Sequence, residues 1–174
     1  MKHLYFIRHG LSEMNKTGVW SGAASESPLT AEGRNQAKAA GIAAKQLGLD
    51  YIISSPLSRA HDTAKIIAGA IGYPEEKIEL NSLLIERDLG PLEGQPWDPD
   101  LNLDDIADVE TAEEITRRAK LTLAHLQTLD AESILVVSHG SFGRAFRHVI
   151  HPDIPFEVSE VGYRFPNGQI IKLL

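Results

Sequence analysis

The sequence contains no cysteine, which excludes a disulfide framework and any thiolate metal site. It also lacks a long apolar run. The N-terminal apolar stretch covers only Leu4 to Ile7 and ends at Arg8, so it is too short for the core of a signal peptide or for a membrane-spanning helix. We therefore expect a soluble, cytoplasmic protein that has no membrane partner.

Positive charge is scarce and scattered along the chain. The 17 Lys and Arg residues against 24 Asp and Glu give a net charge of −7, and no Lys/Arg cluster occurs. Nucleic acid is therefore not expected as a partner, and an anionic substrate would have to be bound by local charges. The absence of a G-x-S-x-G elbow disfavours a serine hydrolase, and the absence of a Walker-type glycine loop disfavours a P-loop NTPase.

Length and periodicity predict one α/β domain spanning residues 1–174. With 43% apolar residues, 174 residues suffice for one well-buried core and are few for two. Apolar runs predict strands at residues 3–7, 50–54 and 133–138, with weaker candidates at 77–80 and 169–173. Helical spacing predicts helices at residues 30–47, 55–72, 111–129 and 142–150. Thr30, Ser55 and Thr111 are the expected N-caps, with Pro56 as the first residue of its helix.

This alternating order predicts a three-layer sandwich, in which a mostly parallel central sheet has helices on both faces. In such a sheet the ligand crevice lies beyond the carboxyl ends of the strands. Arg8-His9, Arg59 and His139 each follow a predicted strand, so the topology should gather two guanidinium groups and two imidazoles. That set suits a phosphoryl group, and phosphoryl transfer is the reaction that fits best.

A family resemblance strengthens this hypothesis. The string from Arg8 to Asn15 resembles the RHGxxxxN motif of the histidine phosphatase superfamily, the phosphoglycerate-mutase-like proteins. Further matches follow in the order of that family. They are Ser27-Pro28-Leu29-Thr30-Ala31-Glu32-Gly33 with Gln36-Ala37, Ser54-Ser55-Pro56-Leu57-Ser58-Arg59-Ala60, Glu86-Arg87-Asp88-Leu89-Gly90-Pro91-Leu92-Glu93-Gly94 and Ser138-His139-Gly140. Five motifs in order are far more specific than any one of them.

The resemblance implies a role for each motif residue. His9 would be the nucleophile that forms a phosphohistidine, and Glu86 would be the acid that protonates the leaving oxygen. The residues implied to hold the transferring phosphoryl group are Arg8, Asn15, Arg59 and His139. Ser12, Ser21 and Gly22 lie where they could add contacts to the phosphate. The family needs no metal, and we expect neither a metal nor another cofactor here.

The remainder of the pocket decides between phosphatase and mutase. The resemblance implies a small cap insertion at about residues 95–132. This stretch is short for a mutase cap, and Leu89 stands where the mutase pattern has a tyrosine. A small cap leaves a phosphohistidine open to water, so we favour hydrolysis of a small phosphorylated metabolite. The candidate specificity residues are Trp20, Arg87 and Trp97. The Arg117-Arg118 pair is interpreted as a surface feature of its helix.

Other functions stay open at this point. A cofactor-dependent phosphoglycerate mutase is one alternative. A regulatory protein phosphatase acting on phosphohistidine is another, although Trp97 and the aspartate-rich loop after it argue against the shallow cleft that it would need. A catalytically idle phospho-ligand binder is disfavoured because every motif position holds a competent residue. Both a monomer and a homodimer are compatible with the sequence.

Overall fold

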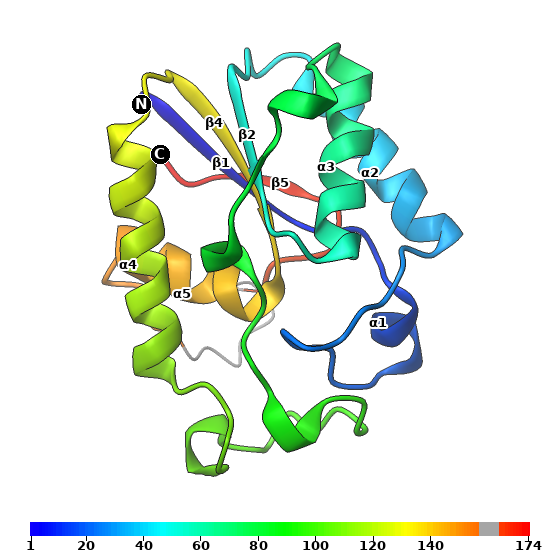
Figure 1. Ribbon diagram of the computed structural model, residues 1–174, viewed down its shortest axis with the longest axis vertical. Coiled ribbons are helices and arrows are strands. Elements are labelled where there is room, and N and C mark those ends of the chain that lie inside the picture. The colour runs from blue at the N-terminus through cyan, green and yellow to red at the C-terminus, as the bar shows by residue number, and fades with distance from the viewer. Residues whose placement is uncertain (157–163) are drawn as a thin grey trace.

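A five-stranded sheet forms the centre of the computed structural model, which describes residues 1–156 and 164–174. The strand order is β3-β2-β4-β1-β5 (Figure 1). The strands are β1 (His3–Arg8), β2 (Tyr51–Ser54), β3 (Glu79–Leu80), β4 (Ser133–Ser138) and β5 (Ile170–Lys172). All neighbours pair in parallel except β5, which runs antiparallel to β1. The predicted α/β fold with a mostly parallel sheet is confirmed.

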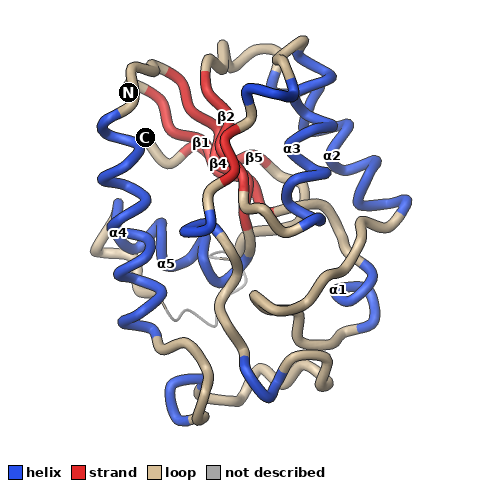
Figure 2. The backbone as a smooth tube through the Cα atoms, viewed as in Figure 1, coloured by secondary structure: helices blue, strands red, loops and turns tan. Residues whose placement is uncertain are grey.

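Helices cover both faces of the sheet (Figure 1). One face carries α2 (Ala31–Ala44) and α3 (Ser58–Ile71), and the other carries α4 (Ala112–Thr128) and α5 (Gly140–Ile150). The short α1 (Glu13–Thr17) lies among the loops at the lower end of the molecule (Figure 2). No helix of residues 1–156 or 164–174 is long and apolar enough to cross a membrane.

Strand alternation explains the two cores. On β1, Leu4 and Phe6 point into the cluster shared with α4 and α5, whereas Tyr5 and Ile7 point into the cluster shared with α2 and α3. The strand β4 is buried at all six positions. Because both faces are covered, such strands appear in the sequence as continuous apolar runs rather than as alternating ones.

Helix starts differ from prediction at two places. Thr30 and Thr111 cap α2 and α4 as expected, and Thr111 forms a full capping box with Glu114. Ser55, however, is not an N-cap, because α3 begins at Ser58 after an uncapped Leu57. The Ser55 hydroxyl is held instead by the Leu57 N–H at 3.3 Å and by a ring nitrogen of His139. The last helix, α5, begins two residues earlier than predicted, directly after His139.

Candidate active site

The two imidazoles meet where β1 and β4 end. These strands are in register, with Arg8 beside Ser138, so the next residues, His9 and His139, leave the sheet at the same level. Their ring centroids lie 5.1 Å apart, and both side chains are buried. This edge of the sheet faces the loop-rich lower end of the molecule (Figure 2). The predicted convergence of residues more than a hundred positions apart is confirmed.

His9 is held as a neutral imidazole. Its Nδ1 lies 2.7 Å from the carbonyl oxygen of Gly10, which can only accept a hydrogen bond, so Nδ1 carries the proton and Nε2 keeps its lone pair. Burial lowers the pKa of His9 well below its ordinary value, and the charges of Arg8 and Arg59 lower it further. The unprotonated Nε2 is the form that a nucleophile requires.

His139 contacts the Ser55 hydroxyl at 2.8 Å through Nε2. Its Nδ1 is buried and has no hydrogen-bond partner within the described residues. Burial also lowers the pKa of this imidazole well below its ordinary value. The positive charge of Arg59 lowers the pKa further. The ring is therefore neutral, with one nitrogen occupied and the other vacant.

Arg8 and Asn15 are linked across the N-terminal loop. Nη2 of Arg8 donates to Oδ1 of Asn15 at 3.5 Å, and Nη1 donates to the carbonyl of Phe165 at 3.3 Å. Asn167 was not expected from the sequence, yet its Nδ2 donates to the carbonyl of His9 at 2.9 Å and lies 3.4 Å from Oδ1 of Asn15. Asn167 thus connects the segment before β5 to the nucleophile candidate.

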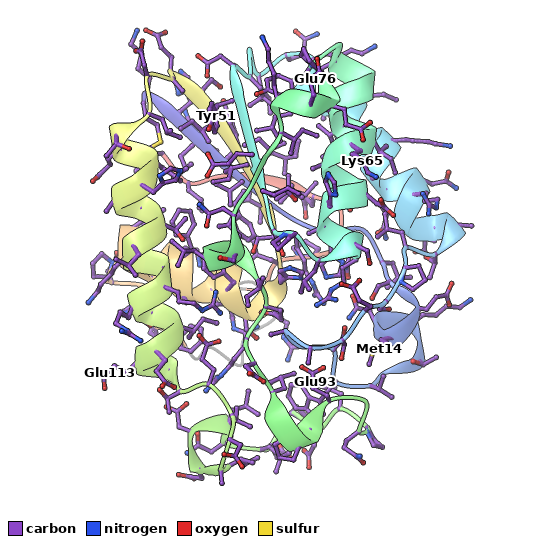
Figure 3. All side chains as sticks on the ribbon, viewed as in Figure 1. Met14, Tyr51, Lys65, Glu76, Glu93 and Glu113 are labelled. Carbon is purple, nitrogen blue, oxygen red and sulfur yellow. The ribbon has the colours of Figure 1, made fainter. Side chains whose placement is uncertain are left out.

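Arg59 is fully buried and is anchored by a loop. Its Nη1 and Nη2 donate to the carbonyls of Ser25 and Gly22 at 2.6 and 2.9 Å. Glu93 fixes the same loop, since its carboxylate accepts from the Gly22 and Ala24 N–H groups and from the Ser25 hydroxyl. Figure 3 labels Glu93 at the lower end of the molecule.

Glu86 sits at the N-terminus of α5 and is 8% exposed. Its Oε1 accepts from the N–H groups of Phe142 and Arg87 at 3.0 and 2.9 Å, and its Oε2 accepts from Ser141 N–H at 3.1 Å. A helix N-terminus favours a carboxyl group through its free N–H donors. These hydrogen bonds fix the orientation of the Glu86 carboxyl group. The carboxyl group also interacts electrostatically with the guanidinium group of Arg8.

A pocket of about 810 Å³ lies beside these groups, and His9, Arg59 and His139 are not among its lining residues. Arg8, Asn15 and Glu86 line its wall. The indoles of Trp20 and Trp97 meet edge to face at 6.2 Å, because the segments 18–20 and 94–97 pair through backbone hydrogen bonds. Trp97 is 46% exposed. Within the predicted cap range, residues 97–103 line the pocket, whereas α4 packs in the core.

Several buried polar atoms around this site lack a hydrogen-bond partner within residues 1–156 and 164–174. They are Arg8 Nε, Arg59 Nε, His139 Nδ1, Ser21 Oγ and Trp20 Nε1. Unpaired buried polar atoms are costly and rare in folded proteins, so their concentration at one site indicates a bound polar ligand. Most of them are donors, which favours an anion.

Three predicted site residues are placed differently from the expectation. The Ser12 hydroxyl is buried as the N-cap of α1 and accepts from Asn15 N–H, so it can position Asn15 but does not line the pocket. The Gly22 N–H is already donated to Glu93. Arg87 is fully buried in an ion pair with Asp104 and is not among the residues that line the pocket, because a buried charge requires a partner.

Arg117 and Arg118 lie in different environments, one exposed and the other largely buried. Arg117 is exposed, as the sequence suggested. The interpretation as a surface feature is wrong for Arg118, which is largely buried and hydrogen-bonded to the segment that carries Glu86.

Comparisons with known proteins agree with this geometry. The family model of the histidine phosphatase superfamily, branch 1, matches residues 4–170. A Salmonella arizonae protein named probable phosphoglycerate mutase GpmB is 36% identical over 155 residues, which cover 80% of this chain and 70% of that protein.

Solved structures show the same fold. The product of an open reading frame of Mycobacterium tuberculosis matches with a TM-score of 0.79 and 29% identity, over 97% of this chain and 89% of that one. The alpha-ribazole phosphatase of Shigella flexneri matches with a TM-score of 0.80 and 24% identity, over 98% and 89% of the two chains. The chain therefore belongs to the histidine phosphatase superfamily.

Proposed function

We propose that this protein is a metal-independent phosphomonoester hydrolase, which acts on a small phosphorylated metabolite through a phosphohistidine at His9. The observation that carries the proposal is a set of three buried nitrogens, Nε of Arg8, Nε of Arg59 and Nδ1 of His139, that have no hydrogen-bond partner in the described part of the chain. They accompany the His9 imidazole, which is neutral and keeps its lone pair on Nε2 for attack. A phosphoryl group would supply the oxygens that these donors lack.

In the first step, Nε2 of His9 attacks phosphorus and the bond between phosphorus and the ester oxygen breaks. The guanidinium groups of Arg8 and Arg59 stabilise the charge on the phosphoryl oxygens. His139 would accept from the Ser55 hydroxyl at Nε2 and donate from Nδ1 to a phosphoryl oxygen. Glu86 gives its proton to the leaving oxygen, so that a neutral alcohol departs.

In the second step, the carboxylate of Glu86 takes a proton from a water molecule as its oxygen attacks the phosphohistidine. The nitrogen–phosphorus bond breaks and inorganic phosphate is released. The first step leaves Glu86 ionised and the second restores its proton, so the enzyme returns to its initial state.

Features of the pocket support a small-molecule phosphatase over the alternatives. Leu89 is buried against the pocket and offers no hydroxyl to a phosphoglycerate, which disfavours the mutase. Relatives are named both as phosphatases and as a phosphoglycerate mutase, so the mutase stays the second candidate. The indoles of Trp20 and Trp97 line the pocket and contact each other, and such an aromatic wall favours a small substrate over a protein.

Hydrolysis of p-nitrophenyl phosphate tests the proposal. We expect activity in the presence of a chelator, loss of that activity in His9→Ala, and retention in the matched control His3→Ala, since His3 lies at the opposite end of β1. Rapid quenching with radiolabelled substrate should trap an acid-labile label on the protein. An acid-stable phosphoserine or a metal requirement would contradict the mechanism.

A panel of phosphorylated metabolites would identify the substrate, with phosphoglycerate isomerisation measured in the same samples. Release of inorganic phosphate faster than isomerisation supports the hydrolase. Isomerisation without net phosphate release would instead assign the mutase activity.

A further inference from the structure

Arg118 of α4 holds the backbone of the segment that ends in Glu86. Its Nη1 donates to the carbonyls of Leu83 and Ile85 at 2.6 and 3.1 Å, and its Nη2 donates to the carbonyl of Glu86 at 3.3 Å. One guanidinium group therefore binds three carbonyls within four residues. The planar, forked geometry of arginine makes this possible, and lysine could not reproduce it.

Glu110 matches the charge of Arg118. Its Oε1 accepts from Nε of Arg118 at 2.6 Å, and its Oε2 accepts from Nη2 at 2.8 Å, so the pair is bidentate. The two side chains are 17% and 12% exposed. Oε2 of Glu110 also lies 3.2 Å from the Asp88 N–H that donates to it. The ion pair is thus hydrogen-bonded to the backbone on both sides of Glu86, at Ile85 and at Asp88.

The same arginine also contacts the element that binds the Glu86 carboxyl group. The guanidinium carbon of Arg118 lies 5.4 Å from the centre of the Phe142 ring. The N–H of Phe142 donates to Oε1 of Glu86. Arg118 therefore links the backbone of Glu86 to the helix start that orients its carboxyl group.

We propose that the Arg118–Glu110 pair is a positioning device for proton transfer by Glu86. This inference rests on the proposed function, in which Glu86 protonates the leaving oxygen while Nε2 of His9 forms its bond to phosphorus. The hydrogen bonds of Arg118 and Glu110 join them to each other and to the backbone around Glu86, so the pair acts through Glu86 and not on the substrate.

The consequence is a dependence on the leaving group. An alcohol such as glycerol departs as a strongly basic alkoxide unless it receives a proton, whereas p-nitrophenolate is stable without one. A displaced Glu86 should therefore slow the cleavage of an alkyl phosphate much more than that of p-nitrophenyl phosphate. A general loss of folding would slow both substrates equally.

The experiment compares kcat/KM on glycerol 2-phosphate and on p-nitrophenyl phosphate for the wild type, Arg118→Gln, Arg118→Lys and Arg117→Gln. This constant covers the steps up to alcohol release, so slow hydrolysis of the phosphohistidine does not mask the effect. Arg117 is the matched control, because it is the exposed neighbour on the same helix. Misplacement of a catalytic group by about 1 Å can cost about 100-fold.

We expect Arg118→Gln to lose about 10- to 100-fold on glycerol 2-phosphate and less than about threefold on p-nitrophenyl phosphate. Arg118→Lys should recover part of the loss, and Arg117→Gln should match the wild type. Equal losses on both substrates, or no loss on either, would overturn the proposal. If Arg118→Gln does not fold, Glu110→Gln carries the same expectation, because it keeps the acceptor for Asp88 N–H and removes the charge.

Glu86→Gln separates this inference from the proposed function. Selective loss in Glu86→Gln without selective loss in the Arg118 and Glu110 variants would overturn the positioning role and leave Glu86 as the acid. A wild-type protein that cleaves neither ester, although folded, would overturn the proposed function itself, and the positioning role with it.

Discussion

Gly33 and Gly69 are both helical glycines, but alanine should have opposite effects at the two positions. A Cβ built on Gly33 would overlap the carbonyl oxygen of Leu11 and lie 2.8 Å from Leu11 N. A Cβ built on Gly69 would meet no atom within 4 Å. Leu11 lies two residues after His9, so the close approach at Gly33 packs the start of α2 against the nucleophile loop.

The expected magnitudes follow from two opposing effects. Alanine is favoured over glycine in a helix by about 1 kcal/mol. At exposed Gly69 this gain stands alone, so Gly69→Ala should stabilise the protein by about 0.5–1 kcal/mol. At Gly33 the overlap is with rigid backbone, and overpacking of this kind costs about 1–3 kcal/mol. After the helix gain of about 1 kcal/mol is subtracted, the net loss should be up to about 2 kcal/mol.

Urea and thermal unfolding of the two variants would measure these changes in the free energy of unfolding. For a chain of this length, 1 kcal/mol corresponds to about 2–4 °C, so the melting temperature of Gly33→Ala should lie below that of Gly69→Ala by up to roughly 12 °C. Gly33→Ala should also lower phosphatase activity, because the loop after His9 must move. A Gly33→Ala protein that is as stable as Gly69→Ala would refute the inferred backbone contact.

Other predictions concern titration, capping and ligand binding. Because burial and Arg8 lower the pKa of His9, its imidazole should stay neutral below about pH 6.5, where ordinary histidines protonate, and ¹⁵N chemical shifts from pH 7 to 5 would report this. The pKa of His139 is lowered as well, so unfolding takes up protons in acid. The free energy of unfolding should therefore be fully retained above about pH 6.5 and fall below it, by up to about 1.4 kcal/mol per pH unit for each of the two imidazoles. Urea unfolding should show a shallower acid dependence in His139→Gln, and an unchanged slope would contradict this. Thr111→Ala should destabilise α4 by about 1 kcal/mol in the same assay, because it removes the capping box. Inorganic phosphate at 100 times its dissociation constant should stabilise the fold by about 2.7 kcal/mol, and no rise in melting temperature would count against the anion site.

The sequence predicted the sheet and the meeting of the two imidazoles well, for a physical reason. Strands buried on both faces, such as β4, form uninterrupted apolar runs that need no alternation to be recognised. Once the strands are parallel, topology alone places His9 and His139 at the same edge. Local signals also located the caps at Thr30 and Thr111, because capping depends on residues three positions apart.

The supporting residues could not be predicted, because their roles depend on contacts distant in sequence. Glu93 acts on a loop about 70 residues earlier, and Asn167 reaches back to His9. Arg117 and Arg118 are adjacent and chemically identical. Arg118 is largely buried and Arg117 is exposed, because the two side chains leave α4 in different directions. Ser55 had the signature of an N-cap, but contact with His139 took precedence.

Strand β1 is synthesised more than a hundred residues before its parallel partner β4 and its antiparallel partner β5. At about 5–20 residues per second, a ribosome needs on the order of ten seconds to deliver those partners. During that interval the apolar β1 segment of the nascent chain has no sheet to join, which makes it a target for chaperones. Translation arrested before β4 should therefore yield chains that cannot retain phosphate.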